Sequence, residues 1–328
     1  MTEALLNVRK LRVEFSAQRY ATVAVDDVSF DVREGEILGV VGESGAGKSS
    51  LANAIIGLID PPGRIAVDEI RLRGRRIDNL GPEAMRRVRG KEIGMTLHDP
   101  LTTLDPLYRI GAQLSETILT HADLSPAIAR QRALELLADV GIPSPADRID
   151  SYPHEFSGGM RQRVVIALAL AASPRLLIAD EPTTALDVSI QWQIIALLKR
   201  LCQKHGLAII LISHDMGVIA EAADRVAVMY AGRMVEIGPV AQVVKSPLHP
   251  YSRGLMECVP RFRLAQDRLR QIPGAMPRMA GSAPGCAFAP RCSQVLPRCA
   301  KDRPQFSTNG PSTVACWLYG APGSKAGA

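Results

Sequence analysis

The chain has 328 residues, of which 47% are hydrophobic and 22% charged, a balance typical of an ordered globular protein with one large domain and an appendage, or two ordinary domains. Its longest apolar runs, at 164–172 and 207–212, are much shorter than the roughly 20 residues that span a bilayer, so we expect no membrane-spanning helix. The net charge of +6 comes largely from scattered cations, which favours a solvated basic face over a surface for nucleic acid or anionic lipid.

The N-terminal residues have the alternating pattern of β-strands. Residues 1–15 lack the contiguous apolar region and cleavage site of a secretory signal, so we expect the protein to stay in the cytosol. Residues 8–15 and 23–32 alternate apolar and polar side chains, and residues 37–41 form a short apolar run that ends in a glycine loop. We predict three strands here, followed by a helix.

The segment 42–49, GESGAGKS, matches the pattern GxxxxGK[ST] between an apolar strand and a predicted helix. Its glycines allow a tight turn that directs backbone N–H groups at a β-phosphate, and the helix N-terminus adds a favourable dipole. Lys48 should neutralise the β- and γ-phosphate oxygens, and Ser49 should ligate Mg²⁺. The alternative is a glycine-rich turn with a chance lysine, which the flanking strand and helix disfavour. We therefore predict that ATP is bound by Gly42, Glu43, Ser44, Gly45, Ala46, Gly47, Lys48, Ser49 and Ser50.

The middle of the chain is helical. Residues from about 106 to 172 are rich in Ala, Leu, Arg and Glu with helical periodicity, and we predict an inserted helical subdomain over about 99–172. Within it, the segment 156–163, FSGGMRQR, opens a helix with Ser157 in a natural N-cap position. Such a helix end binds anions, although a capped helix with two glycines is also common on its own.

Two carboxylates follow the next apolar strand, in the segment 175–182, RLLIADEP. In a phosphate-loop enzyme, Asp180 would hold Mg²⁺ through water and Glu181 would polarise the attacking water. The alternative is an ordinary strand that ends in a turn. Strands at 176–179 and 207–212 are each followed by a helical pattern, and this alternation predicts an α/β fold with a parallel, helix-covered sheet.

The segment 156–163 resembles the LSGGQ signature of ABC ATPases, with Phe156 in place of Leu and Met160 in place of the final Gln. The resemblance implies a phosphate-loop α/β fold with a mixed sheet core, an antiparallel N-terminal β-subdomain, the helical insertion and a small C-terminal domain. It also implies that two such domains pair head to tail, so that Ser157, Gly158 and Gly159 of one close over the ATP of the other. Hydrolysis then requires a dimer, which could be a homodimer or a heterodimer.

The same resemblance assigns roles to three further residues. Asp187, in Ala185-Leu186-Asp187, is similar to the loop that communicates across the dimer interface, and His214 is similar to the switch histidine that contacts the γ-phosphate. A lone His after a strand is more often structural, but its place one strand beyond the carboxylates favours a catalytic role. Tyr20 matches the aromatic residue that stacks on adenine, with Phe15 as the alternative.

His98 departs from the family pattern, which has a catalytic Gln after the strand at 92–97. Imidazole is a poor ligand for Mg²⁺, so we expect His98 to act through hydrogen bonds rather than as a metal ligand. ATPase activity should then fall as the pH drops through roughly 6.5, and a His98→Gln variant should have a different acid limb. The alternative is a weakened site in this subunit, with an intact site on a homologous partner and a mainly regulatory role here.

The C-terminal residues form a separate region in the sequence, and we divide the chain into 1–245 and 246–328 because prolines and glycines multiply after Gly238. Three motifs, HPY at 249–251, IPG at 272–274 and GCAFAPRC at 285–292, resemble the tail of oligopeptide and dipeptide importer ATPases and their nickel or glutathione relatives. The resemblance implies an ATP-hydrolysing subunit that energises peptide uptake from the cytoplasmic face of the inner membrane. Its partners would be a second ABC ATPase subunit, two transmembrane permease subunits and an extracytoplasmic solute-binding protein. A soluble ABC ATPase acting on nucleic acid or ribosomes is disfavoured, because the chain has neither a coiled-coil insertion nor tandem cassettes.

Four of the six cysteines, Cys286, Cys292, Cys299 and Cys316, follow the spacing C-x5-C-x6-C-x16-C. Disulfides are not expected in the cytosol, and clustered thiols there suggest a metal, yet the C-x2-C pair usual for structural zinc is absent. A cysteine-ligated [4Fe–4S] cluster tolerates irregular spacing better, so we predict it ahead of unliganded thiols and zinc.

Overall fold

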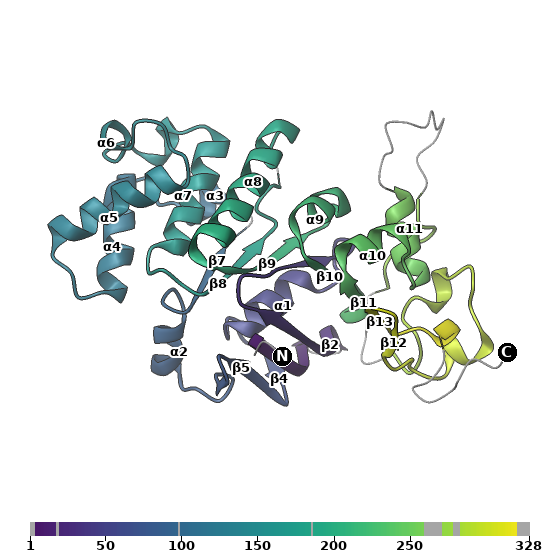
Figure 1. The fold of residues 1–328 in the computed structure, drawn as a ribbon. Helices are drawn as coiled ribbons and strands as arrows, with labels where there is room; N and C mark the ends of the chain where they lie inside the picture. Colours follow the sequence, from purple (N-terminus) through teal and green to yellow (C-terminus); the bar gives the residue numbers. More distant parts are fainter. Residues whose placement is uncertain are drawn as a thin grey trace. The chain divides into compact units, whose positions relative to one another are not determined.

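The computed structural model describes residues 4–17, 20–97, 99–184, 186–258, 271–277 and 283–319 (Figure 1). These residues form two compact units, each built from segments that are separated in the sequence. Unit 1 contains Val32–Ile37 and Asn79–Ile212. Unit 2 contains Ala4–Asp31, Leu38–Asp78 and the described residues from Ser213 onward. No helix in the described ranges is long and apolar enough to cross a bilayer.

An antiparallel sheet forms the N-terminal part of unit 2. Its strands are β1 (Ala4–Ala17), β2 (Tyr20–Arg33), β4 (Gly63–Ala66), β5 (Glu69–Leu72) and β6 (Arg75–Arg76). The order is β2-β1-β5-β6, with β4 also paired to β1. In the register of β1 with β5, Leu6 faces Leu72 and Val8 faces Ile70, and all four side chains are buried. Their alternation with polar residues places one apolar face of the sheet in the core, as the sequence pattern predicts.

The second sheet of unit 2 is mixed. Its strands run in the order β12 (Ser307–Asn309), β13 (Ser312–Val314), β11 (Arg233–Pro239), β10 (Arg225–Tyr230) and β3 (Ile37–Val41). β3 and β10 are parallel, whereas β10, β11, β13 and β12 pair antiparallel in turn. The helices of this unit are α1 (Lys48–Ile55), α9 (Met216–Ala222), α10 (Val240–Lys245) and α11 (Pro250–Cys258). The predicted mixed sheet is therefore confirmed, and the C-terminal residues add two strands to it.

Unit 1 contains three parallel strands in the order β9 (Ala208–Ser213), β8 (Leu176–Asp180) and β7 (Ile93–Thr96). Every residue of β8 and β9 is buried, which agrees with their nearly continuous apolar sequences. The helix α8 (Val188–His205) connects β8 to β9, and it ends where Gly206 adopts a left-handed conformation with φ of 61°. The strand and helix alternation in the sequence thus predicts these elements correctly.

The helical part of unit 1 lies between β7 and β8. Besides α2 (Pro82–Val88), which precedes β7, its helices are α3 (Pro100–Thr103), α4 (Ile110–His121), α5 (Pro126–Asp139), α6 (Pro145–Arg148) and α7 (Gly158–Leu170). The helices α4, α5 and α6 lie together (Figure 1), and α4 and α5 both contact α7. Ser125 begins α5 by accepting a hydrogen bond from the N–H of Ile128, and Pro126 occupies the first helical position. The described residues of 99–172 contain no strand, in agreement with the predicted helical insertion.

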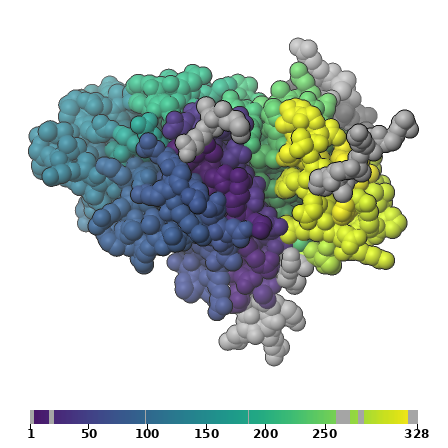
Figure 2. Space-filling model, turned by 60° about the horizontal axis from the view of Figure 1, so that its bottom comes forward, coloured from purple at the N-terminus to yellow at the C-terminus, as the bar shows by residue number. Residues whose placement is uncertain are grey.

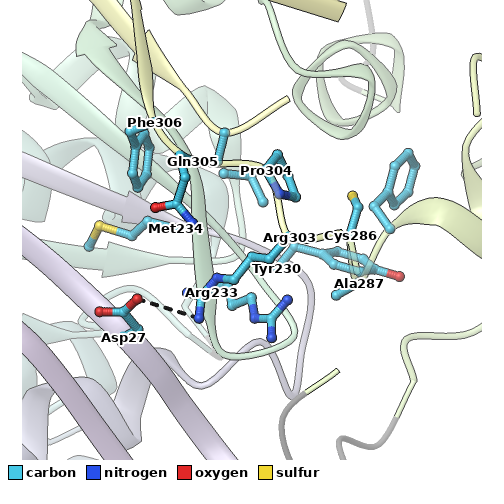
Figure 3. A pocket seen from close by; sticks show the side chains of 13 residues that line it. Asp27, Tyr230, Arg233, Met234, Cys286, Ala287, Arg303, Pro304, Gln305 and Phe306 are labelled. Atoms are coloured by element: carbon cyan, nitrogen blue, oxygen red, sulfur yellow. Dashed lines mark ion pairs between the residues drawn. The ribbon is translucent and has the colours of Figure 1, made fainter. Parts of the chain in front are cut away.

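The C-terminal residues of unit 2 are fixed to its N-terminal strands by buried charges, and Figure 2 shows these residues, in yellow, against the purple strands. Asp26, on β2, is only 2% exposed and forms ion pairs with Arg12, Arg233 and Arg303. Arg303 also pairs with Asp27 at 3.4 Å, beside a pocket of about 60 Å³ (Figure 3). A buried carboxylate requires such partners, so this cluster helps to attach the C-terminal residues to the N-terminal strands.

The HPY motif forms the next connection within unit 2. The carboxylate of Glu236, on β11, is fully buried and accepts hydrogen bonds from the N–H groups of Leu248 and His249, both at 2.9 Å. The Nδ1 atom of His249 accepts the N–H of Tyr251 at 3.0 Å, at the start of α11. Burial, and secondarily the positive charge of Arg253, lowers the pKa of His249 to about 3. His249 is therefore a neutral structural residue at physiological pH.

This buried histidine makes stability depend on pH. The unfolded chain binds a proton at this side chain below about pH 6.5, whereas the folded chain does so only near pH 3, so stability is complete above pH 6.5 and falls as the pH decreases. We expect His249 to lower the free energy of unfolding by about 1.4 kcal/mol between pH 8 and pH 5.5. Urea unfolding at the two pH values measures this change.

The matched variant is His249→Asn, which keeps an acceptor for the N–H of Tyr251 but does not titrate. Its loss of stability between pH 8 and pH 5.5 should be smaller than that of the wild type by the same amount. Equal losses in the two proteins would contradict the assignment.

Candidate functional site

The phosphate loop of unit 2 connects β3 to α1 and turns around the ammonium of Lys48. Lys48 is 4% exposed, and its Nζ donates hydrogen bonds to the carbonyl oxygens of Gly42 at 2.9 Å and Glu43 at 3.2 Å. Gly45 and Gly47 have φ angles of 80° and 99°, a left-handed conformation that side chains other than glycine rarely adopt. The sequence GxxxxGK therefore folds into a loop closed on its own lysine.

Two further features of this loop fit a nucleoside triphosphate with Mg²⁺. A Cβ atom at Gly42 would overlap the carbonyl oxygen of Met229 on β10, so the loop approaches the sheet as closely as a backbone can. The first turn of α1 has no side-chain cap, and Ser44 and Ser49 are exposed beside it. Uncapped N–H groups, a lysine and a serine hydroxyl at one helix end are the donors and the oxygen ligand that phosphates and Mg²⁺ require.

The two predicted carboxylates of unit 1 lie at the end of β8. Asp180 is 4% exposed, and Glu181 follows in a left-handed conformation with φ of 47°. The N–H of Glu181 donates to the carbonyl of Ile212 on β9 at 3.0 Å, and its Oε2 accepts a hydrogen bond from the hydroxyl of Thr184 at 2.9 Å. These two hydrogen bonds fix both the backbone and the carboxylate of Glu181 at the end of the strand. Thr184 is a residue that the sequence analysis did not select.

The signature segment and the loop after the carboxylates are both at helix N-termini of unit 1. Ser157 is the exposed N-cap of α7, and its Oγ accepts the N–H of Met160 at 3.4 Å. A Cβ at Gly159 would clash with the side chain of Ile190, whereas one at Gly158 would have room. Asp187 is the exposed N-cap residue of α8. The predicted signature helix is therefore present, with its N-terminal residues exposed.

The remaining predicted site residues have different outcomes. His214 is exposed in unit 2, directly after β9 and before the helix α9, which Asp215 caps. His98 lies outside the described residues, as does Ala185 of the segment that contains Asp187. Tyr20 begins β2, but its side chain is also outside the description, so the predicted stacking on adenine stays a prediction. The phosphate loop and His214 thus belong to unit 2, whereas the two carboxylates, the signature segment and Asp187 belong to unit 1.

The four C-terminal cysteines do not support the predicted iron–sulfur cluster. All of them are free thiols, and no group of three or more His, Cys, Asp or Glu in the described ranges is arranged to hold a metal. Burial raises the pKa of the Cys286 and Cys292 thiols and raises the pKa of the Cys316 thiol to about 11, and the neighbouring cysteines add to each increase. The predicted iron–sulfur cluster therefore has no support in the geometry of the described residues.

The comparison with protein families decides the classification. The ABC transporter family model matches residues 25–184, and the model of the oligopeptide/dipeptide transporter C-terminal region matches residues 235–299. The chain is 46% identical to the dipeptide transport ATP-binding protein DppD of Escherichia coli (strain K12) over 93% of each chain. It belongs to the ABC transporter family. This ABC ATPase therefore carries both the cassette and the C-terminal region that the sequence motifs indicate.

Other relatives of this ABC ATPase agree along nearly the whole chain. It is 45% identical to DppD of Bacillus subtilis (strain 168), covering 96% of this chain and 95% of that protein. It is 46% identical to the oligopeptide transport ATP-binding protein OppD of the same organism, covering 96% of this chain and 88% of that protein. Members of this family bind ATP with Mg²⁺ and hydrolyse it, which is the chemistry that the phosphate loop and the carboxylates of this ABC ATPase predict.

Solved structures of ABC cassettes share its fold. The ATP-binding cassette MJ0796, in a dimeric post-hydrolysis state bound to ADP and Pi, superposes with a TM-score of 0.65 at 25% identity, covering 72% of this chain and 98% of that one. A second dimeric structure of MJ0796 gives a TM-score of 0.64 at 26% identity with the same coverage. The predicted fold class, an ABC-type α/β cassette, is confirmed.

Proposed function

We propose that this ABC ATPase hydrolyses ATP to energise the import of di- and oligopeptides. The observation that carries the proposal is the phosphate loop closed on Lys48, in a chain that also contains the C-terminal region of peptide transporters. The relatives DppD and OppD, whose names state dipeptide and oligopeptide transport, support the choice of cargo.

In this proposal the residues of the loop bind the triphosphate. Lys48 and the N–H groups of residues 44–50 neutralise the β- and γ-phosphate oxygens, and Ser49 with Asp180 holds the metal. Bound Mg–ATP supplies the phosphoanhydride bond that is cleaved and the charge of the ion. Tyr20 stacks on the base. The buried position of Lys48 supports this role, because a fixed ammonium binds phosphate without first losing side-chain freedom.

Glu181 acts as the general base of the proposed reaction. Its carboxylate orients a water molecule and takes a proton from it, while Thr184 fixes the orientation of the carboxylate at Oε2. His214 and His98 contribute hydrogen bonds at the γ-phosphate. The residues Ser157, Gly158, Gly159 and Asp187 act on the nucleotide bound by a second ABC ATPase subunit, as the exposed N-termini of α7 and α8 allow.

The proposed partners follow from the same assignment. A second ABC ATPase subunit completes the nucleotide sites, and the dimeric cassettes of MJ0796 support such pairing. Two transmembrane permease subunits form the pathway, and an extracytoplasmic binding protein selects the peptide. We place this ABC ATPase at the cytoplasmic face of the inner membrane, as a peripheral subunit.

Reconstitution of the chain with its permease subunits in proteoliposomes tests the function. We expect ATP hydrolysis that increases when a binding protein loaded with a dipeptide or an oligopeptide is added on the opposite side. Stimulation by nickel or by glutathione instead of peptides would overturn the proposal that peptides are the cargo. Absence of Mg–ATP hydrolysis by the wild-type complex would overturn the ATPase assignment.

A further inference from the structure

Glu43, the second residue of the phosphate loop, is held from two directions within unit 2. On the loop side, its carbonyl accepts hydrogen bonds from Lys48 Nζ at 3.2 Å and from the N–H of Ala46 at 3.1 Å. On the opposite side, its N–H donates to the hydroxyl of Tyr251 at 2.9 Å, and its carboxylate pairs with Arg291 at 3.0 Å. The last two residues belong to the HPY and GCAFAPRC motifs, so the C-terminal region directly contacts the loop.

Tyr251 is a rigid acceptor for the loop. It is fully buried, and its ring lies 4.6 Å from that of Tyr230 and 5.4 Å from that of Phe288. Its own N–H is fixed by His249, as described above. Burial raises the pKa of the Tyr251 hydroxyl well above its usual range, so the group stays neutral at every physiological pH. Ionisation of Tyr251 therefore does not disturb its hydrogen bond to Glu43 in this pH range.

The guanidinium of Arg291 connects Glu43 to the C-terminal region. Its side chain is 6% exposed, and Nη1 donates to Oε2 of Glu43 and to the hydroxyl of Tyr230 at 3.3 Å. The other nitrogens, Nε and Nη2, donate to the carbonyl oxygens of Pro273 at 2.8 Å and Ile272 at 3.2 Å. This planar group therefore satisfies four acceptors at once, which a lysine cannot do.

We propose that Tyr251 and Arg291 are positioning residues for the phosphate loop. By fixing both the backbone and the carboxylate of Glu43, they hold the carbonyl that orients the Lys48 ammonium, so the C-terminal region sets the geometry in which the loop meets the triphosphate. The inference rests on the proposed function, because it assumes that this loop binds Mg–ATP. It assigns the HPY and GCAFAPRC motifs a role in nucleotide binding.

The expected effect follows from the fraction of molecules with a competent loop. The apparent Kd of a ligand rises in inverse proportion to that fraction. We expect that removing either the Tyr251 hydrogen bond or the Arg291 ion pair lowers the fraction of molecules with a competent loop to about a tenth. The Kd for Mg–ATP then rises about tenfold. The Tyr251→Phe variant keeps the ring but leaves the N–H of Glu43 without its acceptor, and Arg291→Met keeps the length of the side chain but removes all of its donors.

A matched control is available on the same region. Arg253 makes a comparable set of hydrogen bonds, to the carbonyl of Pro247, to Gln294 and to the hydroxyl of Tyr319. None of these bonds involves Glu43, so Arg253→Met weakens the C-terminal region without releasing the loop. We expect it to lower thermal stability as Arg291→Met does while leaving the Kd for Mg–ATP within about twofold of the wild type.

The experiment measures Mg–ATP binding to the purified full chain by calorimetry, together with amide hydrogen exchange in peptides that cover 42–48 and, as an internal reference, 82–88. Tyr251→Phe and Arg291→Met should raise the Kd for Mg–ATP about tenfold. Both variants should accelerate amide exchange in 42–48 but not in the reference segment 82–88. Wild-type affinity in both variants, or an equal loss of affinity in Arg253→Met, would overturn the inference. Failure of the wild type to bind Mg–ATP would instead overturn the proposed function.

A double-mutant cycle keeps the inference testable if Arg291→Met does not fold. Glu43→Gln removes the charge that pairs with Arg291, and it is combined with Arg291→Lys, which keeps the positive charge but not the planar group. If the increase in Kd of the double variant is smaller than the product of the two single increases, the two residues are coupled through Glu43. Effects that multiply without coupling would overturn the role of Arg291, because they would show that it does not act through Glu43.

Discussion

Replacing Lys48 with Ala should lower the affinity for Mg–ATP by about 100-fold or more. The ammonium is buried at the base of the loop and bonded to the carbonyls of Gly42 and Glu43, so it is ready to bind phosphate without reorganisation. Hydrogen bonds to charged groups contribute about 1.5–3 kcal/mol each, and the ammonium makes more than one of them to a triphosphate. The Kd from titration calorimetry on the purified chain measures the loss.

Lys245→Ala provides the control for this change. Lys245 is an exposed lysine in the last turn of α10, in the same unit, and its removal changes the net charge equally. It should leave the Kd unchanged, because an exposed charge is screened by salt within about 10 Å. If Lys48→Ala bound Mg–ATP as the wild type does, the loop would be a structural turn rather than the nucleotide site.

Elements built from consecutive residues were predictable from the sequence. The phosphate loop depends on glycines at fixed positions and on a lysine that bonds back to Gly42, so its geometry is local and the pattern GxxxxGK[ST] specifies it. The same holds for β8 and β9, whose apolar runs are buried on both faces. The N-cap of α7 at Ser157 also follows from adjacent residues.

Contacts between distant segments could not be predicted in this way. The strand β13 has three residues and is stabilised by pairing with β11, of which Ile237 faces Thr313, so short-range alternation does not reveal it. Glu43 is 208 residues before Tyr251 and 248 residues before Arg291. Both C-terminal residues lie in motifs that are visible in the sequence, but only the fold shows what these residues contact.

The predicted cluster at the cysteines depends on the same kind of contact. Their spacing along the chain places four thiols in one region, but ligand geometry depends on where each side chain points. Cys299, for example, is buried and accepts a hydrogen bond from the N–H of Leu296, within its own turn. A sequence pattern reports which ligand types are near one another, and it does not report whether they converge on a point.

The largest effect on catalysis is expected at Glu181. Glu181→Gln keeps the size of the side chain and its acceptor for the hydroxyl of Thr184, but the amide cannot take a proton from water. Because general base catalysis contributes about 10²–10⁴-fold to a rate, we expect kcat for ATP hydrolysis in the assembled complex to fall by that amount. The Kd for Mg–ATP should stay within about threefold of the wild type, since the change removes transition-state stabilisation rather than binding.

Two further variants separate this role from a general loss of charge or order. Glu116→Gln, at an exposed position of α4 in the same unit, should leave kcat unchanged. Thr184→Val removes one hydrogen bond from the carboxylate and should lower kcat by about 3–10-fold, because a single hydrogen bond is worth about 0.5–1.5 kcal/mol. Hydrolysis by Glu181→Gln at more than a tenth of the wild-type rate would mean that the base lies elsewhere, including on a homologous partner subunit.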